Sequence, residues 1–261
     1  MTPRPTVRWT VSDEEGPMSD TQTRVRRERP TTPEPEKGRG LLWAGVALIT
    51  AGALVLAWVA WEFWGTNWVS HRHQQTVLSQ LKDGWADGTD GVRTDFGRAT
   101  AILHVPRFGK DYAEPVLEGT SDEVLAAGIG HMEDTADAGQ EGNYVLAAHR
   151  VTHGEPFAQF PSLKAGDKVY VETRTKTYTY VLDNGGTDLI VPFTTDWVIQ
   201  PHPVNPDGGV QPPYDEIEGA QPGGGSTTAK LITLVTCSEI FHTDNRSVVF
   251  GHLVDVTPSE G

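Results

Sequence analysis

LITLVTCSEIFHTDNR, residues 231–246, is the stretch that decides how this chain folds and what it does. The residues up to Cys237 are almost all apolar or β-branched, and with Lys230 they predict a buried strand over 230–237. Cys237 is the only cysteine in 261 residues. A lone thiol in an exported protein indicates an intermolecular disulfide or a reactive group, whereas a free cysteine can also pack as a small apolar residue. By itself the stretch leaves two equal alternatives for Cys237: a reactive thiol or an apolar residue packed in the core.

Export is indicated by residues 41–61, which hold no charged side chain over 21 positions. As a helix they would be about 32 Å long, enough for the roughly 30 Å hydrocarbon core of a bilayer. Lys and Arg concentrate before this stretch, so the positive-inside rule predicts a cytoplasmic N-terminus and an extracellular C-terminus. Ala-Gly-Ala at 51–53 could instead end a signal peptide, but more apolar residues follow it at once. We expect an uncleaved, single-pass anchor over 41–64 in the cell membrane.

Charge divides across this anchor. Residues 1–40 sum to +1, whereas the remainder holds 13 Lys/Arg against 28 Asp/Glu and sums to −15. Nucleic acid needs a basic surface for its phosphates, so the acidic exterior argues against it as a partner.

The segments on either side of the anchor lack the pattern of a folded core. Residues 1–40 are rich in Pro, Thr, Arg and Glu and predict a disordered cytoplasmic tail. Residues 65–98 hold a short helix-like piece and then turn residues, which we interpret as an extracellular stem. His71 and His73 could ligate a metal as a pair, but no third ligand is near them in the sequence. We interpret both histidines as solvated.

Residues 99–257 predict one compact β domain, followed by a short tail over 258–261. The strand candidates are rich in Val, Ile, Thr, Tyr and Leu and are separated by turn residues. They cover residues 100–106, 114–119, 143–148, 168–173, 177–183, 230–237 and 247–256. Helical pieces are few and short, such as 120–128. The expected fold class is therefore mainly β, a closed barrel with short helices preceded by one transmembrane helix.

A reactive thiol needs a proton partner and a positive group, and the sequence offers candidates for both. Arg246 follows Cys237 by nine positions and begins the next apolar run, so two adjacent antiparallel strands could bring its guanidinium beside the sulfur. His149 ends the predicted strand 143–148, and barrel active sites tend to gather at strand ends. The Pro- and Gly-rich loop 199–229 directly precedes the cysteine strand and should lie near the same place.

These residues carry a family resemblance. TLVTC (233–237) followed by Arg246 resembles the TLxTC…R signature of sortases, the cysteine transpeptidases of Gram-positive surfaces. NYVLAAHR (143–150) resembles their second signature, a strand that ends in Gly-His or Ala-His. Segments 102–119, 153–173 and 196–204 are similar to class E sortases of high-GC actinobacteria. The sequence departs from that class at Ala148, where Gly is usual, and at Met132-Glu133-Asp134, where Tyr-Pro-Gly is usual.

The resemblance implies a sortase-type barrel and a role for each candidate residue. Cys237 would be the nucleophile, His149 the general acid and base, and Arg246 the group that stabilises substrate and oxyanion. Thr236 and Thr233 could help to hold the substrate, although threonines in strands are more often structural.

The resemblance also implies substrates and partners. The enzyme would cleave LPxTG-type sorting signals, or the LAxTG variant of class E, between Thr and Gly. It would then join the surface protein to an amine of a peptidoglycan precursor or cross-bridge. No cofactor is implied. Acidic segments 133–137 and 215–218 are interpreted as solvated loops rather than as calcium ligands.

Two alternatives remain open from the residues. One is a cysteine peptidase that releases the cleaved protein to water. The other is a stalked extracellular binding module whose Cys237 is buried and inert. Labelling of the native protein by a thiol-reactive probe would separate the second alternative from an enzyme.

Overall fold

The computed structural model describes residues 37–61, 66–151, 153–220, 228–237 and 244–259. Nearly all of the predicted tail 1–40 lies outside the described residues. So do residues 62–64 of the predicted anchor, residues 221–227 of the loop 199–229, and the last two residues of the chain.

Helix α1 (Lys37–Ala60) covers most of the predicted anchor. Within the described residues, its segment Arg39–Ala60 is the one helix that is long and apolar enough to cross a membrane. Large apolar side chains such as Leu41, Leu48 and Leu56 are exposed along it. A helix that is apolar on all sides and not covered by protein is typical of a membrane span.

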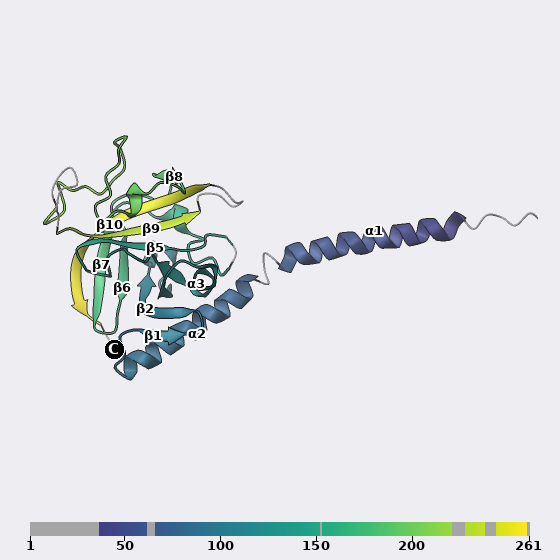
Figure 1. Ribbon diagram of the computed structural model, residues 1–261, viewed down its shortest axis with the longest axis horizontal. Helices are drawn as coiled ribbons and strands as arrows, with labels where there is room; N and C mark the ends of the chain where they lie inside the picture. The colour runs from purple at the N-terminus through teal and green to yellow at the C-terminus, as the bar shows by residue number, and fades with distance from the viewer. Residues whose placement is uncertain (1–36, 62–65, 152, 221–227, 238–243, 260–261) are drawn as a thin grey trace, which may run out of the picture. The chain divides into compact units, whose positions relative to one another are not determined.

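Eight strands close into the barrel that the sequence predicts (Figure 1). Going around the barrel the order is β2, β3, β4, β5, β9, β10, β7 and β6, and β6 pairs back to β2. The strands are β2 (Gly97–His104), β3 (Glu114–Glu118), β4 (Ile129–His131), β5 (Gly142–Ala147), β6 (Lys168–Glu172), β7 (Lys176–Leu182), β9 (Lys230–Cys237) and β10 (Asn245–Pro258). Two three-residue strands lie outside the ring: β1 (Val92–Thr94) pairs with β2, and β8 (Ile190–Pro192) pairs with β10.

Two of the pairings in the barrel are parallel, and the others are antiparallel. β3 pairs in parallel with β4, and short helix α3 (Asp122–Ala127) connects them. β5 pairs in parallel with β9, so both strands end at the same edge of the sheet. Among the described residues, the barrel domain also holds three single 3₁₀ turns: η2 (Pro106–Phe108), η3 (Phe160–Ser162) and η4 (Trp197–Ile199).

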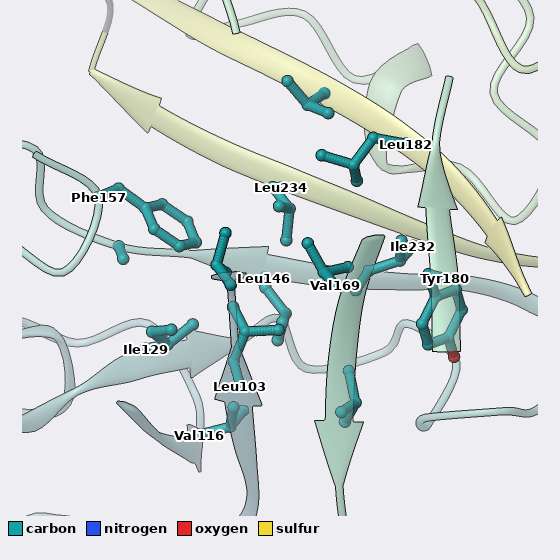
Figure 2. Close-up of a cluster of buried hydrophobic side chains, with 14 of the residues drawn as sticks. Leu103, Val116, Ile129, Leu146, Phe157, Val169, Tyr180, Leu182, Ile232 and Leu234 are labelled. Carbon is teal, nitrogen blue, oxygen red and sulfur yellow. The ribbon is translucent and has the colours of Figure 1, made fainter. Parts of the chain in front are cut away.

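Apolar side chains on alternate strand positions fill the barrel (Figure 2). Leu103 from β2, Leu146 from β5, Val169 from β6, and Ile232 and Leu234 from β9 are all fully buried in this cluster. Burying one such side chain contributes about 1.5–3 kcal/mol. The core thus fixes β5 and β9 side by side and gives their ends a rigid support.

Helix α2 (Thr66–Ala86) differs from the expected stem. It is longer than the sequence suggests and packs against β1, β2, β3 and α3. Its Val77 and Leu81 are fully buried against Ile102 and Leu117 in a second apolar cluster. Residues 66–94 therefore form part of the folded unit, because this helix covers apolar side chains on the outer face of the barrel wall.

The two stem histidines have contacts within this unit. His71 Nδ1 lies 3.1 Å from Gln74 Oε1, while the half-buried His73 ring lies 4.4 Å from the ring of Phe96. The expectation of a solvated side chain fits the exposed His71 and is wrong for His73.

Candidate active site

Three strand ends bring the candidate residues together. Cys237 is the last residue of β9 and pairs directly with Arg246 of the antiparallel β10. On its other side β9 pairs in parallel with β5, where Val235 lies opposite Ala147. His149 follows two residues after Ala147, at the edge of the sheet where β9 ends with Cys237. Cys237 and Arg246 are therefore direct partners, and His149 lies just beyond the end of the neighbouring strand β5.

Hydrogen bonds beyond the end of β5 support this register. The Ala148 N–H donates to the Val235 carbonyl at 3.2 Å, and the Thr236 hydroxyl donates to the Ala148 carbonyl at 2.8 Å. Arg150 Nη1 donates to the Cys237 carbonyl at 3.3 Å. The backbone of Ala148 thus continues along β9, and the side chain of Arg150 extends to the end of that strand.

Cys237 is half-buried. A fully buried cysteine would be expected from simple core packing. A partly exposed thiol at a strand end can be reached by a substrate carbonyl, and a reactive thiol requires this access.

His149 is half-buried, and its environment disfavours the imidazolium. Burial lowers the pKa of His149 below its ordinary value, and His153 lowers it further, whereas Asp122 acts in the opposite direction. The rings of His149 and His153 lie 5.1 Å apart, tilted by 31°. A histidine whose pKa is tuned by burial and a second imidazole is suited to proton transfer.

The loop after His149 has an unusual backbone. His153, Gly154 and Glu155 have φ values of 52°, 81° and 48°, all in the left-handed region. For a residue other than glycine this conformation costs roughly 1–2 kcal/mol. The His149 carbonyl accepts a hydrogen bond from the Phe157 N–H at 2.9 Å, which closes the loop.

Arg246 is flanked by β8. The pairing of β8 with β10 sets Val191 opposite Arg246, and the guanidinium carbon lies 5.9 Å from the ring centroid of Phe193. Arg246 Nη1 also donates to the Asn245 carbonyl at 3.0 Å. Phe193 and Ile190 are more than half exposed at 59% and 53%. An apolar surface therefore lies next to the cation.

Thr233 and Thr236 have structural contacts. Thr233 is fully buried, and its hydroxyl donates to Asn143 Oδ1 at 2.7 Å. Thr236 is buried, and its hydroxyl holds the Ala148 carbonyl. These contacts favour the structural reading of both threonines over substrate binding.

The acidic segment 133–137 contributes one residue to a cluster that the sequence does not reveal. Glu118, His131 and Asp137 have potential metal-ligating atoms within 4.8 Å of one another. Glu118 Oε2 lies 2.9 Å from His131 Nδ1, and this hydrogen bond lowers the pKa of Glu118. Two of the three side chains are thus already hydrogen-bonded to each other. In segment 215–218, Ile217 is buried in a small apolar cluster.

Three residues near the site were missed from the sequence: Arg150, His153 and Asn67. Arg150 and His153 follow His149 closely, but spacing does not reveal a ring contact or a bond across strands. Asn67 contacts Gly154 from 87 positions earlier in the chain. Only the fold brings that residue to the loop.

Comparisons with known proteins point to one family. The family model described as "Sortase domain" matches residues 103–254. Sortase E1 of Streptomyces coelicolor is 32% identical over 222 residues, which cover 82% of this chain and 57% of that protein. The chain therefore spans little more than half of the length of that relative.

A second relative and a solved structure extend the comparison. Sortase E2 of Streptomyces coelicolor is 29% identical over 232 residues, which cover 83% of each chain. The structure of the SrtA sortase from Actinomyces oris is 27% identical with a TM-score of 0.51, over 64% of this chain and 86% of that one. Because the family match spans more than half of the 261 residues, this chain belongs to the sortase family of cysteine transpeptidases, with class E sortases of Streptomyces among its relatives.

Proposed function

We propose that this chain is a membrane-anchored transpeptidase in which Cys237, His149 and Arg246 perform the chemistry. The observation that carries the proposal is the direct pairing of Cys237 with Arg246 across β9 and β10, beside the end of β5, which His149 follows. In a binding module with an inert cysteine, these three residues would have no reason to lie near one another. The half-buried state of Cys237 also favours a reactive thiol over core packing.

In the acylation step, the Cys237 thiolate attacks the carbonyl carbon of Thr in a Thr–Gly bond. The Arg246 guanidinium donates to the oxygen, where negative charge develops. His149 as imidazolium gives its proton to the departing Gly amine, because an amide nitrogen leaves only when protonated. The C–N bond breaks, and the substrate remains as a thioester on Cys237.

In the deacylation step, an amine of a peptidoglycan precursor or cross-bridge attacks the thioester carbonyl. The now neutral His149 accepts a proton from this amine, and Arg246 again stabilises the oxyanion. The C–S bond breaks with the electron pair returning to Cys237, so a new amide leaves and the starting protonation state is restored.

The substrate class follows from the resemblance to class E. We assign sorting signals of the LPxTG type, with LAxTG as the preferred form. Phe193 and Ile190 offer an exposed apolar surface beside Arg246, which fits an apolar residue ahead of the scissile bond. Segments 128–143 and 199–229 are the places where the preference would be set.

We assign α1 as an uncleaved anchor, with the N-terminus in the cytoplasm and the barrel outside the cell. Its length, its apolar exposed side chains and the basic residues before it support this assignment. Protease added to intact cells should then remove the barrel and spare the N-terminal tail. The reverse pattern would overturn the orientation.

One experiment tests the reaction itself. The full chain is incubated with a sorting peptide, with and without a glycine-based amine, and Cys237 is examined by mass spectrometry. We expect a thioester adduct on Cys237 and, with the amine, a new conjugate. Cleavage that yields acid alone even at high amine concentration would identify a hydrolytic peptidase. The absence of both adduct and cleavage would overturn the enzyme proposal.

A further inference from the structure

The loop that follows His149 is fastened to helix α2. Asn67 Oδ1 accepts a hydrogen bond from the Gly154 N–H at 2.9 Å, and Asn67 Nδ2 donates to Glu155 Oε1 at 2.6 Å. One side-chain amide thus holds two consecutive residues of the loop. Because Asn67 lies in the first turn of α2, the contact joins α2 to the loop that follows His149, the proposed general acid and base.

The turn that Asn67 holds is the left-handed one at His153, Gly154 and Glu155. Such a backbone persists only where the surroundings hold it in place. The bond from Asn67 reaches the N–H at the centre of this turn. Releasing it would free the turn to relax toward more common φ values.

Gln74 makes a second close contact between α2 and the turn. A Cβ atom at Gly154 would lie 2.3 Å from Gln74 Nε2, so the end of the Gln74 side chain would have to shift to accept another residue, and the φ of 81° also favours glycine there. Gln74 is buried, and within the described residues its Nε2 has no hydrogen-bond partner. A buried amide nitrogen without a hydrogen-bond partner costs free energy, so the packing of Gln74 against the turn must offset this cost.

The other side of the turn contacts His149. The His153 ring lies 5.1 Å from the His149 ring, and the Phe157 N–H binds the His149 carbonyl. The backbone of His149 and its imidazole are therefore both contacted by the loop that Asn67 fixes.

We propose that Asn67 is a positioning residue, which sets the place of the His149 imidazole relative to Cys237 through the turn His153–Glu155. The inference rests on the proposed function for its kinetic readout only. Proton transfer requires a donor within hydrogen-bond reach of the leaving nitrogen. A displacement of about 1 Å at such a group can reduce the rate by roughly 10²-fold.

The pKa of His149 depends on where its ring lies, because burial and the neighbouring His153 both act on it. Two titratable groups act on it, His153 from its own loop and Asp122 from α3. Burial and His153 together lower the pKa of His149. Both effects weaken if the turn is released, so its titration midpoint should rise toward the ordinary value.

The test compares Asn67→Ala with Gln75→Ala in the full chain in detergent micelles. Gln75 is an exposed amide on the same helix and serves as the matched control. Kinetics with a sorting peptide and an amine give kcat and KM. NMR of ¹³Cε1-labelled histidine gives the His149 midpoint without substrate, with the signal assigned by its loss in His149→Gln.

For Asn67→Ala we expect kcat to fall about ten- to hundredfold, with KM within about twofold of wild type. The His149 midpoint should move to higher pH, while Gln75→Ala changes none of these values. A wild-type kcat, or a reduced kcat with an unmoved midpoint, would overturn the positioning role. A loss of thermal stability without a midpoint change would assign Asn67 a purely structural role and would also overturn it.

A second variant covers the case in which Asn67→Ala does not fold. Glu155→Gly removes one of the two Asn67 contacts but allows the φ of 48°. We expect a smaller midpoint change in the same direction, and an unchanged midpoint would overturn the proposal. If wild type shows no acyl transfer at all, the proposed function fails, yet the NMR comparison still decides the role of Asn67.

Discussion

Cys237 and Arg246 are direct partners across β9 and β10, the last residue of one strand facing the second residue of the next. Paired residues in an antiparallel ladder have Cα atoms about 4.5–5.5 Å apart. The sheet, and not the connecting loop, therefore sets the distance between the thiol and the base of the guanidinium side chain. A cation held this way can act on the carbonyl that the thiol attacks.

Two substitutions of Arg246 should distinguish the contribution of its positive charge from that of its planar guanidinium group. Arg246→Ala should reduce kcat/KM by about 10²–10³-fold, because a donor to the oxyanion is lost. Arg246→Lys should stay close to the Ala variant, since a point charge lacks the planar fork of donors. Peptide cleavage assays measure both. The control is Arg174→Ala, which removes an exposed ion pair with Asp90 and should leave the rate unchanged. Wild-type activity in Arg246→Lys would contradict the assigned role.

Replacing the proposed nucleophile and its proposed proton partner should give two distinct defects. Cys237→Ala should abolish both the acyl adduct and the product, because no other cysteine is present. His149→Ala should slow turnover by about 10³-fold, as expected for loss of general acid–base catalysis. Mass spectrometry of the intact protein and product analysis measure these effects. Transpeptidation that persists in Cys237→Ala would refute the mechanism.

Helix α2 should be required for stability, whereas residues 1–64 should not. A chain that begins at residue 65 should be soluble and folded, while one that begins at residue 99 should lose stability because the outer apolar cluster is uncovered. Within the longer form, Leu81→Ala should lower the free energy of unfolding by about 2–5 kcal/mol, since Leu81 is fully buried. Lys82→Ala, exposed on the same helix, is the control. Denaturant unfolding decides, and equal stability of Leu81→Ala and Lys82→Ala would contradict the packing role.

The strands of the barrel could be predicted because their side chains have a strong local signal. Residues 230–237, for example, are the observed β9. The predicted strands 168–173 and 177–183 likewise match β6 and β7, which pair in antiparallel. Three-residue strands β1, β4 and β8 were missed, since so short a run has no periodicity to detect.

The candidate site was predicted only in part, for a physical reason. Cys237 and Arg246 lie on consecutive strands, so chain proximity suggests their contact. The parallel pairing of β5 with β9, after whose end His149 follows, joins distant segments, and only the family resemblance linked His149 to Cys237. The role of α2 was misjudged because its polar composition hides a narrow apolar stripe through Val77 and Leu81.

Substrate preference can be measured with two peptides. We expect a higher kcat/KM for a peptide with Leu-Ala-x-Thr-Gly than for one with Leu-Pro-x-Thr-Gly, on class resemblance. The two peptides should differ at this one position, and cleavage is followed by chromatography. A reversed ranking would refute the class E substrate assignment and leave the sortase assignment intact.

Stability should depend on pH through His252 and Asp183. His252 Nδ1 lies 2.7 Å from Asp183 Oδ1, and the Asp183 side chain is only 3% exposed. The hydrogen bond to Asp183 raises the pKa of His252, against the opposing effect of burial. A raised pKa in the folded state means that the protonated histidine stabilises the fold. This contribution is fully present below the unfolded value of about 6.5 and is lost as pH rises through the folded value.

His252→Gln should therefore be less stable than wild type at about pH 5.5, and the gap should narrow as pH rises above the folded pKa of His252. Asp183→Asn should also be less stable than wild type at about pH 5.5, because it removes the carboxylate that interacts with the protonated His252. Its stability should therefore lie closer to that of His252→Gln than wild type does. Urea unfolding of the three proteins at a series of pH values measures the effect. A gap between wild type and His252→Gln that stays constant from acid to alkaline pH would show that the ion pair does not stabilise the barrel, since a neutral histidine would then contribute as much as a charged one.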